Sequence, residues 1–310
     1  MSPHHFRHHG MSLVELIIAM AVGMVILTVV SQAYLGGLQS KRANTDITRL
    51  NETSRFAFDL ITRSLRKAGY SNRWGPPPPT GVVPGVVPFC GTTPALMAVN
   101  GAATIDPTAA NLAGATNTVL NASDVLRVSY YGEDNAAGTA ADGSVLDCHG
   151  YPVRRGQRVD EVIFVANDLA TNEPSLFCYT SNPTPAIVGS HPGSLPLVTG
   201  VESMQLLFGE DVELDGVINR YVPWGLARPD GTAFSATSIL SAKLSVVVRT
   251  PNAVGVDNEL RTYNHFSAPG YNYPAVTNAD GGAVFTPTTG AGRLRSMQGV
   301  EIALRNFCTA

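Results

Sequence analysis

A single carboxylate, Glu15, lies near the start of a largely apolar segment, residues 11–38. A charged side chain costs roughly 2 to 4 kcal/mol near the centre of a bilayer on insertion scales, and less near its edge. A residue that carries such a cost is expected to have an ionic partner or a role. Glu15 is therefore the first candidate for a functional residue.

The sequence around this acid has a recognisable order. It reads Gly10-Met11-Ser12-Leu13-Val14-Glu15-Leu16. This run resembles the cleavage and methylation motif of type IV prepilins, although that family has Phe more often than Met after the glycine. The resemblance implies that a prepilin peptidase cuts between Gly10 and Met11, that the new amine of Met11 is methylated, and that Glu15 acts in assembly.

The leader, residues 1–10, has no apolar run before the cut, and the hydrophobic stretch follows it, unlike a secretory signal. We therefore expect the apolar segment to stay on the mature protein. The leader holds two histidine pairs at a spacing that on a helix can share a metal ion, His4 with His8 and His5 with His9. We favour a simpler interpretation, a basic flank that keeps the leader in the cytoplasm until it is removed.

The apolar segment is long enough to cross a membrane once. Residues 16–33 are aliphatic, Met, Ala or Gly except for Thr28, Ser31 and Gln32. At a rise of 1.5 Å per residue, about 20 helical residues span the hydrocarbon core. We expect residues 11–38 to be the transmembrane half of a helix, with the leader inside and the larger C-terminal part exported.

Residues 39–70 are predicted to continue this helix as an amphipathic half. Apolar or small residues recur at intervals of three and four, which places them on one stripe of an α-helix. These residues are Ile47, Leu50, Ser54, Phe58, Ile61, Leu65 and Ala68, and Gly69 is the expected stop. Residues 51–70 also resemble the second signature of PilW-like minor pilins, with an Arg-Phe-Ala, Leu, Arg and Ala-Gly pattern.

All four cysteines lie in the part that is predicted to be exported, and an even number in an oxidising compartment indicates two disulfides. Three pairings are possible. We favour Cys148 with Cys178, because each flanks a strand-like segment and the loop is modest, which leaves Cys90 with Cys308. A zinc site is the weaker alternative, since there is no CxxC pair and His149 is the only nearby imidazole.

Residues 71–310 are predicted to form an exported, β-rich, disulfide-containing domain. Strand-like runs occur at residues 124–131, 161–167, 175–180, 201–208, 240–249 and 299–307. Loops are expected at residues 75–88, 100–118 and 133–147. With the resemblance, these runs predict a type IV pilin-like α+β fold, in which the long N-terminal helix packs on an antiparallel β-sheet domain.

One loop has a pattern of possible metal ligands. Asp211, Glu213 and Asp215 alternate and are followed by Gly216, as in the first half of a calcium loop. The twelfth position, where such a loop has a bidentate Glu, is Val222. We therefore favour a tight acidic hairpin, keep calcium as the alternative, and expect no other cofactor.

The sequence contains no GxSxG, HExxH or Walker-type motif, so we predict a protein that is not an enzyme. The formal net charge is −3, and basic residues cluster only between Lys41 and Arg73. A surface for nucleic acid is therefore not predicted.

The resemblance implies a minor pilin that joins other minor pilins and pilus subunits in a priming or tip complex. It implies an inner-membrane protein with a periplasmic C-terminal domain that later enters the pilus, and so supports adhesion, twitching motility or DNA uptake. Two alternatives stay open. One is a J-type minor pseudopilin of type II secretion, which shares the helix and the cleavage motif, and the other is a pilus-tip adhesin.

Overall fold

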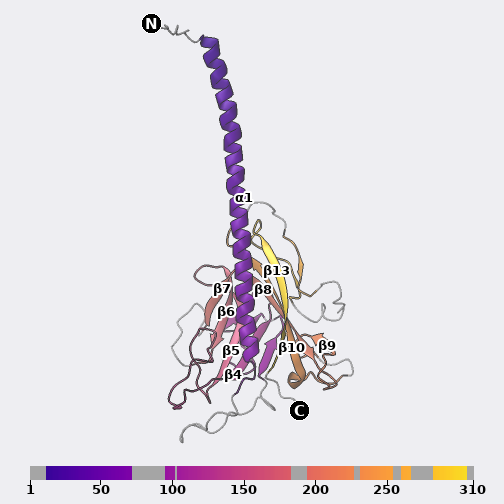
Figure 1. Cartoon of the computed structure of the whole chain (residues 1–310). Helices are drawn as coiled ribbons and strands as arrows, with labels where there is room; N and C mark the ends of the chain where they lie inside the picture. Colours follow the sequence, from indigo (N-terminus) through magenta and orange to yellow (C-terminus); the bar gives the residue numbers. More distant parts are fainter. Residues whose placement is uncertain are drawn as a thin grey trace. The chain divides into compact units, whose positions relative to one another are not determined.

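A computed structural model of the chain describes residues 12–71, 95–101, 103–182, 194–226, 231–253, 260–266 and 282–305. It contains one long helix, α1 (Leu13–Lys67), followed by strands. The chain forms two compact units, residues 1–48 and 49–310, so that α1 belongs partly to each. Figure 1 shows α1 in indigo, with the strands beside its C-terminal part.

The helical residues of the first unit, 13–48, carry an apolar surface that is almost entirely exposed. Threonine hydroxyls in this stretch bond within the helix itself. The Thr28 hydroxyl donates to the carbonyl of Met24 at 2.6 Å, and the Thr45 hydroxyl donates to that of Lys41 at 2.9 Å. Such back-bonding lets hydroxyl residues lie among apolar ones without an unpaired donor.

The end of α1 is fixed by its glycine and by the first sheet. Gly69 has a φ of +73°, the left-handed conformation that commonly closes a helix and that glycine adopts without strain. Its N–H donates to the carbonyl of Ser129 at 3.0 Å, and the N–H of Tyr131 donates to the carbonyl of Tyr70 at 2.9 Å. The chain therefore leaves the helix already bonded to a strand.

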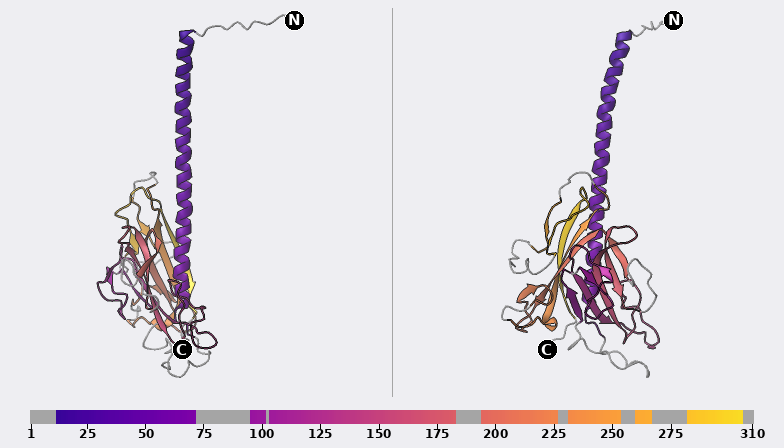
Figure 2. Two further views of the ribbon diagram at one scale, coloured as in Figure 1. Left: turned by 90° about the vertical axis from the view of Figure 1, so that its left-hand side faces the viewer. Right: turned by 180° about the vertical axis from the view of Figure 1, so that it is seen from behind.

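The second unit contains two larger antiparallel sheets. The first has the order β1-β4-β5-β6-β7, and its strands are β1 (Leu96–Val99), β4 (Val125–Tyr131), β5 (Arg158–Asn167), β6 (Pro174–Thr180) and β7 (Ser194–Thr199). The second has the order β13-β10-β8-β9, and its strands are β8 (Val201–Glu210), β9 (Arg220–Val222), β10 (Ile239–Arg249) and β13 (Arg295–Ala303). Figure 2 shows both sheets from two further sides.

Two small pairs and one short helix complete the described elements. They are β2 (Thr104–Ile105) with β3 (Asn117–Thr118), β11 (Tyr263–Asn264) with β12 (Val284–Phe285), and the 3-10 helix η1 (Ala236–Ser238).

One core joins the C-terminal part of α1 to both sheets. The helix contributes Leu50, Ala57, Ile61, Leu65 and Ala68. The first sheet adds residues such as Leu126 and Ile163, and the second adds residues such as Met204 and Leu244. The apolar side chains of the helix and of the two sheets pack against one another, so the three form one α+β unit.

The first sheet is also covered on its other face. A second cluster is built from Ile105, Leu112, Val119, Val125, Val162, Phe164, Ala166 and Phe177. The segment of residues 103–119 lies over this face, and Phe164 and Phe177 stack with ring centroids 5.6 Å apart. Because both faces are buried, β4 is buried at every position and does not alternate.

The structure corrects several predictions about elements. The region 100–118 is not simply a polar loop, because it contains β2 and β3 and buries Ile105 and Leu112 fully. Ile47 is 45% exposed and Phe58 is only partly buried, so neither belongs to the buried stripe of α1, where Ala57 is fully buried. Strands β1, β7 and β9 were not predicted, and the last strand lies at Arg295–Ala303 and not at 299–307. The predicted loop at 75–88 lies outside the described residues.

Candidate functional site

Glu15 occupies the first turn of α1, and Ser12 caps that turn. The backbone N–H of Glu15 donates to the Ser12 hydroxyl at 3.3 Å, and the N–H of Leu16 donates to the Ser12 carbonyl at 3.2 Å. Ser at the cap with Glu three residues later is the capping-box arrangement. The Glu15 carboxylate is exposed and stands where the helix dipole favours negative charge, with no ion-pair partner among the described residues.

The helix that carries Glu15 is long and apolar enough to cross a membrane. Its most apolar window of 18 residues has a mean hydropathy of 2.7, and none of that window is buried within the chain. Large apolar side chains point outward throughout, including Leu13 at 76% exposure. An exposed apolar surface of this length needs lipid or other apolar helices around it.

A buried carboxylate anchors the last turns of α1 to the first sheet. Glu161 of β5 is fully buried, and its Oε2 accepts from the Ser64 hydroxyl at 2.7 Å. Its Oε1 accepts from Lys67 Nζ at 2.6 Å and from the Tyr130 hydroxyl at 2.5 Å. Burial, followed by the charge of Glu161, raises the pKa of Tyr130, so this hydroxyl stays a donor. Since every member has its partner, the anchor compensates the burial of its charges.

A second hydroxyl, just after the helix, strengthens the same end. The Tyr70 hydroxyl donates to Glu133 Oε1 at 2.7 Å. Burial and the neighbouring Glu133 carboxylate raise the pKa of Tyr70 to about 12. Tyr70 is therefore protonated at any physiological pH and remains a donor.

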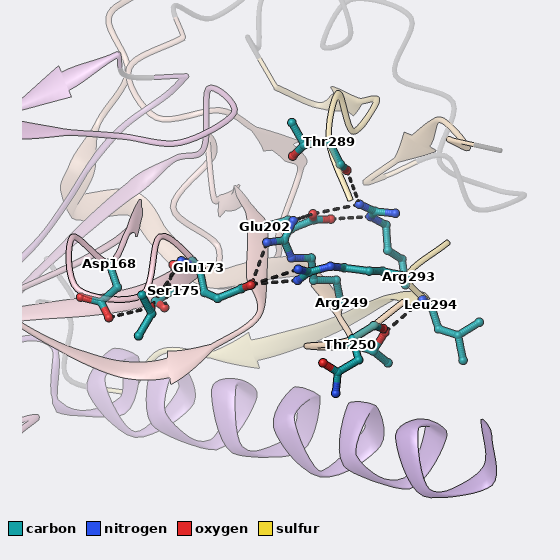
Figure 3. A network of polar contacts seen from close by, with 12 residues as sticks. Asp168, Glu173, Ser175, Glu202, Arg249, Thr250, Thr289, Arg293 and Leu294 are labelled. Atoms are coloured by element: carbon teal, nitrogen blue, oxygen red, sulfur yellow. Dashed lines mark hydrogen bonds and ion pairs between the residues drawn. The ribbon is translucent and has the colours of Figure 1, made fainter. Parts of the chain in front are cut away.

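Five charged side chains form a network that ties the first sheet to the second (Figure 3). Arg249 bridges two acids, with Nη1 at 2.8 Å from Glu202 Oε1 and Nη2 at 2.7 Å from Glu173 Oε2. Arg295 Nε lies 2.6 Å from Glu202 Oε2, and Arg293 binds both oxygens of Glu173 at 2.9 and 3.1 Å. Glu173 directly precedes β6, whereas Glu202 lies in β8, so the arginines hold two sheets through two carboxylates.

The electrostatics of this network follow from its geometry. Hydrogen bonds from Arg293, opposed by burial and supported by Arg249, lower the pKa of Glu173. The side chains of Glu202 and Arg295 are each 4% exposed, and the carbonyl of Thr289 accepts from Arg295 Nη2 at 2.8 Å. Bidentate contacts between a guanidinium and a carboxylate fix the relative orientation of the two groups as well as their distance. The network is therefore a structural joint between the sheets.

Cys148 and Cys178 form a disulfide, the pairing favoured from the sequence, with sulfurs 2.00 Å apart. His149 Nε2 lies 3.0 Å from the carbonyl oxygen of Cys178. Ligand atoms of these three residues lie within 4.8 Å of one another, yet both sulfurs are used in the bond and are not thiolates. The loop between β4 and β5 is thereby fastened to β6.

The acidic run Asp211, Glu213 and Asp215 lies in the hairpin between β8 and β9. The oxygens of Asp211 accept from the backbone N–H groups of Asp215, at 3.3 Å, and of Gly216, at 2.8 Å. The Asp215 carboxylate accepts from Val217 N–H at 2.9 Å. These bonds are those of a turn, in which carboxylates replace backbone acceptors.

Part of the predicted site lies outside the described residues, namely Gly10, Met11, the leader histidines, Cys90 and Cys308. Glu15 and the anchor belong to different compact units. The sequence reasoning missed Ser64, Lys67 and Glu161. The available signals were an acid directly before the apolar run Val162-Ile163-Phe164 and two polar residues three apart on the helix.

Comparison with known proteins gives two family matches. The prokaryotic N-terminal methylation motif matches residues 5–31, and the family described as type IV pilus-assembly protein W matches residues 163–306. A solved structure of a type IV-like pilin from Thermus thermophilus is 14% identical, with a TM-score of 0.42 and coverage of 84% of this chain and 99% of that chain. No curated protein sequence matches the chain.

The methylation motif matches the start of a long apolar helix, and strands of antiparallel sheets follow this helix along the chain. These features define a type IV pilin-like protein. The second match runs from within β5 to just beyond β13, so it covers the second sheet, β6, β7 and part of β5, but not β1 or β4. Residues 163–306 thus resemble the PilW family, and this match and the methylation motif together support a minor pilin that takes part in type IV pilus assembly.

Proposed function

We propose that this minor pilin enters, through residues 13–48, a membrane complex with other minor pilins that starts the fibre. The observation that carries the proposal is the exposed apolar surface of this stretch, interrupted in its first turn by Glu15. Before assembly, lipid surrounds that surface. In the fibre, the apolar helices of neighbouring subunits take the place of lipid, so the same side chains serve both states.

In the proposed complex, Glu15 compensates the methylated amine of Met11, either its own or that of a neighbouring subunit. A charge pair in a medium of low dielectric is stable only when both members are present. The helix also leaves open space at Gly23, Gly36 and Gly37, where an added Cβ would meet no other atom within 4 Å. Small residues of this kind allow neighbouring helices to approach closely.

The proposal includes the processing and the localisation of the subunit. A prepilin peptidase removes residues 1–10, the C-terminal unit lies in the periplasm, and the subunit then leaves the inner membrane for the pilus. The role is structural and not enzymatic, and no calcium is required. Adhesion, twitching motility or DNA uptake would follow from the presence of pili, and not from chemistry on this subunit.

Glu15→Ala tests the proposal, with Glu52→Ala as the matched control, because Glu52 is an exposed acid of the same helix outside the apolar stretch. We expect Glu15→Ala to be processed and inserted normally but to reduce surface pili severely, whereas Glu52→Ala leaves them unchanged. Electron microscopy counts the pili, and immunoblots of membranes measure insertion. Normal piliation with Glu15→Ala would contradict an assembly role for the carboxylate.

A deletion strain separates the pilus from the secretion alternative. Loss of a subunit that starts fibres reduces pili far more than its own abundance suggests, because initiation is needed once per fibre. We expect few pili and normal secretion in the deletion strain. Normal pili with accumulation of secreted proteins in the periplasm would instead support a pseudopilin of type II secretion.

A further inference from the structure

Among the described residues, strand β13 forms an open edge of the second sheet. It is nine residues long, and only Ile302 is buried along it. The other edges are shorter, with four residues in β1, three in β9 and six in β7, where Pro196 interrupts the pairing. Proteins normally protect long edges with proline, lysine or bulges, because an unpaired edge is a template for another strand. By contrast, β13 pairs with β10 in unbroken register.

The register shows which backbone groups of β13 face outward. The N–H of Leu304 donates to the carbonyl of Leu240 at 2.8 Å, and Ala303 stands opposite Ser241. Bonding in an antiparallel ladder alternates, so residues 296, 298, 300 and 302 bond to β10. The N–H and C=O groups of Met297, Gly299 and Glu301 therefore point to the other side, where no described strand pairs with them.

A groove lies beside this edge, at Gly299. Its volume is about 380 Å³, and its lining includes Ser245, His265, Phe266, Met297, Gly299 and Glu301. The wall is held firmly, since the His265 ring nitrogens lie 2.9 Å from the Ser245 hydroxyl and 3.0 Å from the Ser203 hydroxyl. Position 299, which has no side chain, forms part of this lining.

The backbone conformation at position 299 does not require a glycine. Glycine within a strand is unfavourable, and Gly299 does not adopt a positive φ. A Cβ built there would meet only the carbonyl oxygen of Leu244, at 3.4 Å, which is an ordinary contact. The folded chain therefore has room for at least a Cβ at this position.

The opposite edge of the same sheet shows how such a glycine is covered. Gly209 of β8 stands directly opposite Tyr221 of the edge strand β9. The Tyr221 ring lies across it, with Cε1 3.0 Å from the place of a Cβ. The Tyr221 hydroxyl then reaches Ser241 at 3.1 Å, and Lys243 Nζ lies 3.4 Å from the ring centroid. The Ser241 hydroxyl lies closer still to that place, so an aromatic ring and a serine of the two neighbouring strands together cover the glycine.

We propose that β13 accepts an extended strand from a neighbouring pilin subunit, and that an aromatic side chain of this strand fills the groove over Gly299. The added strand would bond to the outward groups of Met297, Gly299 and Glu301, and its residue opposite Gly299 would stand as Tyr221 stands over Gly209. The partner is a pilus subunit because the apolar helices hold subunits side by side, so this inference rests on the proposed function. Backbone bonds then supply affinity, and the groove selects the aromatic residue.

Photocrosslinking in piliated cells locates the partner. Met297, which is 38% exposed beside the groove, is replaced by p-benzoylphenylalanine in the full-length chain. The same replacement at Leu169, which is 72% exposed in the turn between β5 and β6, serves as the control. We expect an adduct with another pilin subunit from position 297 and none from position 169. No adduct, or a crosslink only within the same chain, overturns the proposal.

Gly299→Val then separates binding from folding. The branched residue favours a strand and should preserve or raise the melting temperature, while it fills the groove. Ala303→Val is the matched control, because it lies on the same face of β13 but outside the groove lining. We expect the adduct yield with Gly299→Val to fall about tenfold or more, as when a buried anchor is lost. An unchanged yield overturns the proposal.

The two proposals can fail separately. If Glu15→Ala abolishes pili but the crosslink from position 297 is absent in wild-type fibres, only the strand-docking inference is wrong. If the deletion strain makes normal pili, the assembly proposal fails whatever the crosslink shows.

Discussion

Lys67 Nζ lies 2.6 Å from Glu161 Oε1, a contact that joins the last turn of α1 to a strand 94 residues further along the chain. The Glu161 side chain has no exposed surface, whereas that of Lys67 is 20% exposed. The same ammonium group donates to the carbonyl of Leu146 at 2.9 Å and lies 4.5 Å from the centroid of the Tyr130 ring. One cation therefore holds the helix to the sheet and to the loop before β5.

Removing Glu161 should weaken the C-terminal unit strongly. Glu161→Ala leaves Lys67, Ser64 and Tyr130 without their common acceptor, and loss of one partner of a buried pair costs about 3 to 5 kcal/mol. Chemical unfolding of the full chain in detergent measures the change in unfolding free energy. Asp59→Ala is the control, since it breaks an exposed pair with Arg63 and should change stability by less than about 0.5 kcal/mol. Equal effects of the two changes would refute the anchor.

The network between the sheets should depend more on its buried acid, Glu202, than on its partly exposed arginine, Arg293. Glu202→Ala deprives both Arg249 and Arg295 of a partner in a buried place, so we expect a loss of several kcal/mol, about 3 to 5. Arg293→Ala should cost less, because Arg293 is 20% exposed and Glu173 keeps Arg249. Hydrogen exchange of β8 and β10 amides provides the local readout. A larger loss from Arg293→Ala would contradict this order.

The disulfide should stabilise the domain through the loop that it closes. Cys148→Ser opens a bond across a sequence separation of 30 residues, and we expect a loss of about 3 kcal/mol in the chain-entropy model. Alkylation under denaturing conditions, followed by peptide mass spectrometry, should find the new free thiol at Cys178. Labelling at Cys90 or Cys308 would show that the pairing is wrong.

His265 should make the domain sensitive to acid. Burial lowers the pKa of His265 from 6.5 to about 4, so the unfolded chain binds more protons between these values. The stabilisation is complete above pH 6.5 and is lost as the pH falls toward 4, by up to about 3 kcal/mol. Unfolding midpoints measured from pH 7 to 4 should fall less steeply in His265→Gln. An imidazole that titrates near 6.5 by NMR would contradict the prediction.

Periodicity in the sequence located the strands that carry the core. In β10, Ala242, Leu244 and Val246 are separated by the polar residues Lys243 and Ser245, and this alternation indicates the face that packs in the core. Strand β9 has only three residues, and β7 includes Pro196, so neither has enough pattern to be recognised. Edge strands of this kind are defined by their neighbour and not by their own composition.

The sequence predicted those site residues that stand out from their immediate neighbours in the chain. Glu15 is visible because one acid stands in an apolar helix. The anchor of Ser64, Lys67 and Glu161 depends on a contact between residues about 95 apart, and no spacing rule reports such a pair. The buried stripe of the helix was predicted to begin at Ile47, which is in fact exposed. The apolar spacing continues along the helix whether or not a sheet packs against it.

The way in which α1 ends has a mechanical consequence. Gly69 donates to Ser129 and Tyr70 accepts from Tyr131, so the chain leaves the helix beside β4, two residues beyond the turn that holds Glu161. A pull along the helix axis would load these backbone bonds and the buried ion pair together, and not one after another. Resistance to force is set by the rate of unfolding, and contacts that must break at the same time slow that rate most. A subunit tethered to a fibre by one helix thus has two backbone bonds and a buried ion pair where that helix ends against the sheet.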